Sequence, residues 1–128
     1  MTVQRIGKPP VLPNGATVPL VPATRVGDLI VCSGALGVDA KFKLVEGGVG
    51  PQTRQAIANL EAVLAHAGAS LSDIAKTTIW LTEMDHFAEF NAAYAQAFGT
   101  DVPARSTVTS ALAIPGALVE IEAIASVK

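Results

Sequence analysis

The sequence predicts an α/β (α+β) fold in which one mixed sheet carries two helices on one of its faces. Segments rich in β-branched residues lie before, between and after two segments of helical periodicity. Only 16% of the 128 residues are charged, against about 25% in an average soluble domain. Two helices on one face leave the other face bare, and the low charge leads us to expect that copies of the chain cover it.

Length and composition limit the possibilities further. A chain of 128 residues is too short for two ordinary domains, so we expect a single domain over residues 1–128. Its longest apolar run, residues 29–38, is shorter than the ~20 residues that span a bilayer. The first residues lack a secretory signal pattern, which predicts a cytoplasmic protein. The net charge of −2, without a cluster of Lys or Arg, argues against a nucleic-acid partner.

The first third of the chain is predicted to be extended. Asn14-Gly15 is a typical hairpin turn, and residues 16–21 form an edge strand or an extended arm because Pro19 removes a backbone donor. The aliphatic run Val26–Ser33 suits a central strand. The lone Cys32 in this run is interpreted as a small core residue.

A helix is predicted from Pro51 to Gly68. Apolar residues recur there at three- and four-residue steps, with Pro51 in the first turn and Gly68 after the last. Residues 75–82, which are rich in β-branched side chains, form the next strand.

A second helix follows, for which Asp85 is the candidate N-cap and Gly99 the stop. Its apolar stripe is aromatic and consists of Phe87, Phe90, Tyr94 and Phe98. This spacing is typical of core packing, so Tyr94 is interpreted as a core residue. Two strands, residues 105–113 and 118–127, then flank a turn at Pro115-Gly116.

These last two strands carry the most informative charged residues. Alternation places Arg105 and Thr107 on one face of the first strand, and Glu120 and Glu122 on one face of the second. An Arg–Glu ion pair is one interpretation, and a solvated surface is the other. A tight hairpin would separate Arg105 from Glu120 by about 20 Å. The two residues therefore meet one ligand only if the strands are arranged differently or if they belong to different subunits.

The same region resembles a known family. Its motifs Pro103–Val108 (PARSTV), Leu112–Pro115 (LAIP) and Val119–Ala125 (VEIEAIA) are similar to the C-terminal signature of the RidA/YjgF family of reactive-intermediate imine deaminases. Upstream, Ser33-Gly34 and the segment beginning at Gln52 also match. Asn91 matches too, and we interpret it as a structural residue that bonds to nearby backbone.

The resemblance implies a chorismate-mutase-like fold and a homotrimer with an inner barrel of sheets and clefts between subunits. It implies hydrolysis of 2-aminoacrylate-like or bulkier enamines and imines to 2-oxo acids and ammonia, without a metal or an organic cofactor. Arg105 would hold the substrate carboxylate, and Glu120 would position or activate water. Ser33, Gly34 and Thr107 would complete the substrate-binding lining.

Departures from the family pattern leave a second function open. A gap-free count places Leu20 where deaminating members carry a tyrosine, and Thr107 replaces a common cysteine. Both changes make the mouth of the cleft more apolar, which favours a larger or more hydrophobic imine. They also favour a non-catalytic trimer that binds small carboxylates or proteins. The endoribonuclease label used in this family is a third possibility, which the lack of a basic stripe disfavours.

Overall fold

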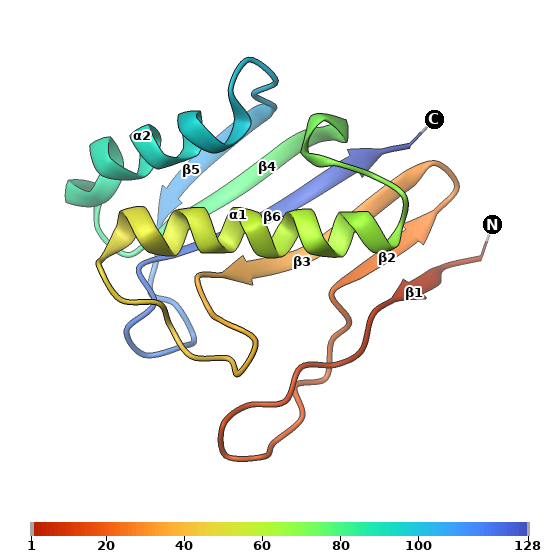
Figure 1. Cartoon of the computed structure of the whole chain (residues 1–128), viewed down its shortest axis with the longest axis horizontal. Helices are drawn as coiled ribbons and strands as arrows, with labels where there is room; N and C mark the ends of the chain where they lie inside the picture. The colour runs from red at the N-terminus through yellow and green to blue at the C-terminus, as the bar shows by residue number, and fades with distance from the viewer. Residues whose placement is uncertain (1, 128) are drawn as a thin grey trace.

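The computed structural model describes residues 2–127. It contains a six-stranded sheet in the order β1-β2-β3-β6-β4-β5, and both helices lie on one side of that sheet (Figure 1). The strands are β1 (Gln4–Ile6), β2 (Ala23–Val26), β3 (Leu29–Leu36), β4 (Ile74–Leu81), β5 (Ala104–Thr109) and β6 (Val119–Ser126). The helices are α1 (Val49–His66) and α2 (Phe87–Phe98). The predicted mixed sheet with two helices on one face is confirmed.

The core lies between the sheet and the two helices. Along β6, residues at alternate positions are buried, and they are Val119, Ile121, Ala123 and Ala125. The stripe predicted for α1, with Ile57, Leu60 and Leu64, is buried against them. The period-two and period-3.6 patterns thus bury one face of each element, as amphipathic patterning requires.

The opposite face of the sheet is apolar but uncovered in the single chain. Leu29, Val31 and Val108 are each more than 40% exposed there, although they lie in regular strands. Such a patch is typical of a surface that associates with another chain. Its burial against copies of this chain stays a prediction.

The first apolar run forms two strands instead of the single strand predicted at Val26–Ser33. The chain reverses between Val26 and Leu29, which pair across the turn. Gly27 has a φ of 58° there, a conformation that glycine adopts without strain. The sequence does not reveal this turn, because the apolar residues on both sides of it form one continuous strand-like pattern. The segment 16–21 is an extended arm, with one isolated bridge between Val11 and Thr17.

The last two strands do not form the hairpin that the Pro-Gly turn suggests. β5 runs parallel to β4, and β6 pairs with the other edge of β4, so β4 lies between them. The reason is that α2 returns the chain to the edge of the sheet at which β4 begins, so β5 runs parallel to β4. The connection from β5 to β6 is therefore a loop that passes the end of β4.

The ends of the helices follow the sequence in most places. Pro51 lies in the first turn of α1, and Gly99 ends α2 with a φ of 61°. Asp85 is not the N-cap of α2, because it lies inside the 3₁₀ turn Met84–His86 that precedes the helix. Neither described helix is long and apolar enough to cross a bilayer.

Candidate functional site

The structure places the two predicted catalytic residues on opposite faces of the sheet. Arg105 pairs with Thr77, whose side chain is buried beneath the helices. Glu120 pairs with Trp80, three residues further along β4, on the face that the helices leave bare. Three residues and two strand spacings correspond to about 14 Å between the two Cα atoms. Within one chain, Arg105 forms no ion pair with Glu120 or Glu122, so the ion-pair interpretation is wrong for the single chain.

Arg105 lies against the aromatic stripe of α2. Its Cζ is 5.0 Å from the ring centroid of Tyr94, 5.3 Å from that of Phe90 and 5.7 Å from that of Phe87. Rings at these distances attract a guanidinium and restrict its orientation. β5 has a partner strand on one side only within the described chain, so Arg105 lies at an edge of the sheet.

Tyr94 belongs to the core, as predicted, and its ring is also the nearest of the three to Arg105. Its hydroxyl forms a hydrogen bond of 2.7 Å with Thr77 Oγ1. Burial raises the pKa of Tyr94, while the hydrogen bond to Thr77 and the charge of Arg105 oppose that rise. The phenol thus stays protonated at neutral pH and serves as a neutral, fixed support for Arg105.

Two buried polar atoms near this strand and helix have no hydrogen-bond partner within residues 2–127. They are Thr107 Oγ1, on the same face of β5 as Arg105, and Asn91 Oδ1 on α2. The interpretation of Asn91 as bonded to nearby backbone is wrong for this oxygen. Most buried polar atoms in native proteins are paired, so each of the two has capacity for a further hydrogen bond.

On the face that the helices leave bare, Glu120 lies close to Gly34. A β-bulge between Cys32 and Ala35 displaces this part of β3. A Cβ atom on Gly34 would collide with Glu120 Oε2 and would lie 2.9 Å from Cδ, so any larger residue at this position would displace the Glu120 carboxyl. Burial, and to a smaller extent the charge of Glu122, raise the pKa of Glu120. This raised pKa brings the carboxyl closer to the range useful for proton transfer.

Ser33 lies beside Gly34 and holds the N-terminal arm. Its Oγ donates a hydrogen bond of 2.7 Å to the carbonyl of Val21, and its backbone N–H donates one of 2.9 Å to the carbonyl of Pro22. The hydroxyl proton is therefore engaged, and Ser33 has only acceptor capacity left for a ligand.

Gln52 supports Glu120 from α1, and the sequence analysis did not identify this role. The Gln52 side chain is 4% exposed and donates to the Gly116 carbonyl at 3.2 Å, while its Oε1 accepts from Leu118 N–H at 2.8 Å. These bonds fix the loop that leads into β6, two residues before Glu120. A polar residue on the buried stripe of a helix was the signal that could have revealed it.

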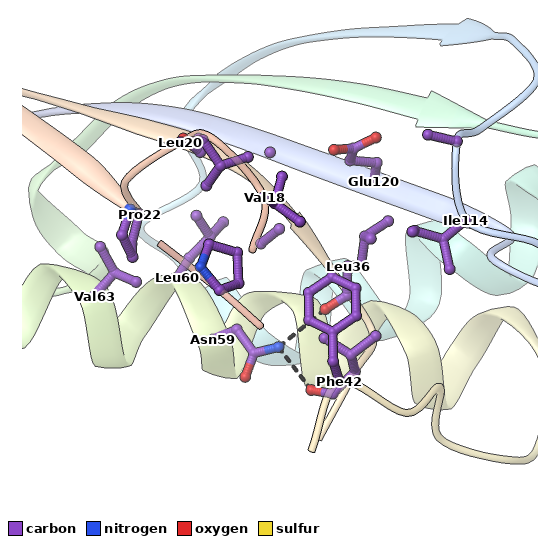
Figure 2. A pocket seen from close by; sticks show the side chains of 16 residues that line it. Val18, Leu20, Pro22, Leu36, Phe42, Asn59, Leu60, Val63, Ile114 and Glu120 are labelled. Atoms are coloured by element: carbon purple, nitrogen blue, oxygen red, sulfur yellow. Dashed lines mark hydrogen bonds between the residues drawn. The ribbon is translucent and has the colours of Figure 1, made fainter. Parts of the chain in front are cut away.

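Two cavities meet at Glu120. The larger has a volume of about 280 Å³ and lies between the arm, β3, α1 and the loop before β6 (Figure 2). Its lining is almost entirely apolar and includes Val18, Leu20, Phe42, Val63 and Ile114, with Glu120 as its one charged residue. The smaller, of about 190 Å³, is mainly polar and is lined by Trp80, Ser110 and Glu122. Gly34 and Glu120 line both cavities.

The structure thus separates the predicted site residues into two groups. Glu120, Ser33 and Gly34 lie together beside the cavities, and Leu20 lies in the same apolar lining. Arg105 and Thr107 lie on the other face. Cys32 is buried and has its pKa raised to about 11 by burial, in agreement with its predicted role as a core residue.

Comparisons with known proteins agree with this fold. The profile of the family described as Endoribonuclease L-PSP matches residues 13–127. Protein HMF1 of Saccharomyces cerevisiae is 42% identical over 104 residues, which cover 81% of each chain. The 2-iminobutanoate/2-iminopropanoate deaminase of Salmonella typhimurium is 38% identical over 111 residues, covering 84% of this chain and 86% of the other. The crystal structure of YEO7 from yeast superposes with a TM-score of 0.88 at 36% identity, covering 99% of this chain and 100% of the other.

Proposed function

This chain belongs to the endoribonuclease L-PSP family, the RidA/YjgF family that its motifs indicate, and on that premise we propose that it hydrolyses reactive enamines and imines of small carboxylic acids. In this reaction R–C(=NH)–COO⁻ and water give R–C(=O)–COO⁻ and ammonia. An enamine such as 2-aminoacrylate enters as its imine tautomer. The carboxyl of Glu120, half-buried where two cavities meet, is the observation that carries the proposal.

The proposed site is completed by a second copy of the chain. Arg105 and Glu120 face away from each other within one chain, so a ligand that contacts both must lie at a subunit boundary. The uncovered apolar face that includes Val31 and Val108 supports such an assembly. We expect the homotrimer that is typical of the family, with Arg105 and Thr107 of one copy opposite Glu120, Ser33 and Gly34 of the next.

The residue types suit this chemistry. An imine carbon is already electrophilic, so the site needs to orient it, deliver water and supply a proton to nitrogen. The guanidinium of Arg105 binds a carboxylate through two parallel hydrogen bonds, and its three aromatic neighbours restrict its orientation. Thr107 Oγ1 and Asn91 Oδ1 have hydrogen-bonding capacity left on the same side.

Glu120 has the proton-transfer role in this proposal. As a carboxylate it accepts a proton from the attacking water, and it then returns that proton to the departing nitrogen. Its raised pKa makes the carboxylate a stronger base towards the attacking water, and the protonated carboxyl then gives its proton to the departing amine nitrogen, which is more basic. Water is the only co-reactant that the reaction requires.

A non-catalytic carboxylate-binding function is the alternative, and Leu20 is the observation that favours it. Leu20 lies in the cavity wall beside Glu120, where the gap-free count places the family tyrosine, and it adds no polar group to the site. Binding through Arg105 would survive this change even if hydrolysis did not. The net charge of −2 disfavours a ribonuclease, because phosphate neutralisation supplies much of the affinity for RNA.

The test is an assay with 2-imino acids generated in situ, followed by ammonia release and by loss of the semicarbazone trap product. We expect the wild-type chain to accelerate hydrolysis and Glu120→Gln to lose at least about 100-fold in kcat. Arg54→Ala, an exposed change on α1, is the matched control and keeps its activity. Tight binding of 2-oxo acids without any acceleration would refute the deaminase and favour the carboxylate-binding alternative.

A further inference from the structure

We propose that the apolar cavity beside Glu120 holds the substrate's side chain, and that the preferred substrates are 2-imino acids with branched aliphatic or aromatic side chains. This inference rests on the proposed function and names its substrate class. The cavity has about 280 Å³, nearly all of it bounded by apolar side chains (Figure 2). An engineered apolar cavity of about 150 Å³ is enough to hold benzene, so this one has room for an isobutyl or a benzyl group.

The two cavities at Glu120 assign a direction to each substituent of the imine carbon. The carboxylate is directed towards Arg105 of another copy. Water and the departing nitrogen need polar neighbours, and the smaller cavity with Ser110 and Glu122 supplies them. The remaining substituent, the side chain, is then directed into the larger cavity, whose lining offers it few hydrogen-bond partners.

An apolar cavity of this size is a cost to the protein if it stays empty. The cavity is partly open to solvent, so its apolar walls face water when it is empty, and covering them with an apolar group gains about 25 cal/mol for each Å² buried. Arm residues Val18 and Leu20 form one wall, and Val63 of α1 forms another. A polar or very small substrate side chain would leave these apolar walls exposed to water, whereas a branched or aromatic side chain would bury them.

Phe42 gives independent support for this role of the cavity. It is the only non-glycine residue with a positive φ in the described chain, at 62°, which is unfavourable for a bulky side chain. The turn that imposes this conformation is held by Asp39, whose Oδ1 accepts from Lys41 N–H at 2.9 Å and Lys43 N–H at 3.0 Å. The result is that the Phe42 ring lines the cavity. Strain of this kind is typical of residues held in place for a ligand.

The test compares 2-imino acids with methyl, isobutyl and benzyl side chains, each generated from the corresponding amino acid by an amino-acid oxidase. In the wild-type chain we expect kcat/KM for the isobutyl and benzyl compounds to exceed that for the methyl compound by about tenfold or more. Val18→Phe, which fills the cavity, lowers that ratio by about tenfold. Val11→Phe is the matched control, because Val11 lies on the same arm, is 56% exposed and does not line the cavity, and it leaves the ratio unchanged.

Phe42→Ala provides a second variant in case Val18→Phe does not fold, which circular dichroism would show. It widens the cavity, and we expect the benzyl compound to gain relative to the isobutyl compound. Equal kcat/KM for all three substrates, or ratios that neither variant changes, would overturn the inference and leave the deaminase intact.

Absence of turnover with every substrate would instead refute the proposed function. The inference is then decided by calorimetric binding of the corresponding 2-oxo acids. Tighter binding of the isobutyl and benzyl compounds, weakened in Val18→Phe, would support the side-chain cavity. Equal or absent binding would overturn it.

Discussion

The two halves of the candidate site are built in different ways. Around Arg105, three aromatic rings of one helix lie within 6 Å of the guanidinium, and the support is regular secondary structure. Around Glu120, the walls come from the arm, a bulged strand and a loop, and they leave two cavities. The comparison teaches that the half around Arg105 fixes the orientation of a charged ligand group, while the half around Glu120 provides space for the side chain, which differs from one substrate to another.

Replacing Arg105 tests the first half and has the largest expected effect. Arg105→Ala removes the group proposed to hold the carboxylate, and we expect kcat/KM to fall by at least about 1,000-fold. Arg105→Lys keeps the charge but loses the planar fork, so it recovers only part of that loss. Size-exclusion chromatography with light scattering should show the oligomeric state unchanged in both variants. Unchanged turnover in Arg105→Ala would refute its assigned role.

Substituting glycine tests the second half, and two glycines in β3 and its extension give a matched pair. Gly34→Ala places a Cβ against the Glu120 carboxylate, so we expect kcat to fall by about tenfold or more while the thermal midpoint changes little. Gly37→Ala places a Cβ 2.5 Å from Gln52 Cα and 2.6 Å from Gln52 O, which are backbone atoms of α1. This variant should lose stability instead, by about 1–3 kcal/mol in urea unfolding. An unchanged kcat in Gly34→Ala would contradict the close contact between Gly34 and Glu120.

Sequence patterns predicted the first half better than the second. The stripe of Phe87, Phe90 and Tyr94 is set by helical periodicity, and alternation placed Arg105 on its face of β5. Periodicity is local, so it predicts which residues share a face but not which strands are neighbours. For that reason the sequence left open whether β5 and β6 form a hairpin, because the position of β4 between them depends on tertiary pairing.

The second half could not be predicted in detail because it depends on contacts between distant segments. The two hydrogen bonds of Gln52 reach residues more than 60 positions away, and no local pattern encodes them. The family resemblance pointed to Ser33, but the hydrogen bond of Ser33 to the Val21 carbonyl depends on the path of the arm. The positive φ of Phe42 is equally invisible in a sequence without glycine or asparagine at that position.

Changes at Tyr94 separate the packing of the first half from its hydrogen bond, and their expected effect is smaller. Tyr94→Phe keeps the ring over Arg105 and removes the bond to Thr77, so unfolding should become easier by about 1 kcal/mol with little change in kcat/KM. Tyr94→Leu also removes the ring, and KM for the carboxylate substrate should rise several-fold because Arg105 loses its nearest aromatic neighbour. Equal KM values in the two variants would show that the ring does not orient Arg105.

The smallest expected effect concerns the charge beside Glu120 and is a shift in pH dependence. If Glu120 acts as a carboxylate, kcat/KM falls as pH decreases through its raised pKa. Glu122→Gln removes the like charge that contributes to this rise, so the acid limb of the profile should move to lower pH. Burial is the larger cause of the raised pKa, and it remains in the variant, so the acid limb should stay above the ordinary range of a glutamate.

The same raised pKa affects stability. Glu120 keeps its proton to higher pH in the folded state than in the unfolded state, so wild-type stability falls as pH rises through this window. The thermal midpoint of Glu122→Gln should show a smaller fall over the same pH range, and an acid limb that does not move would mean that Glu120 is not the titrating group.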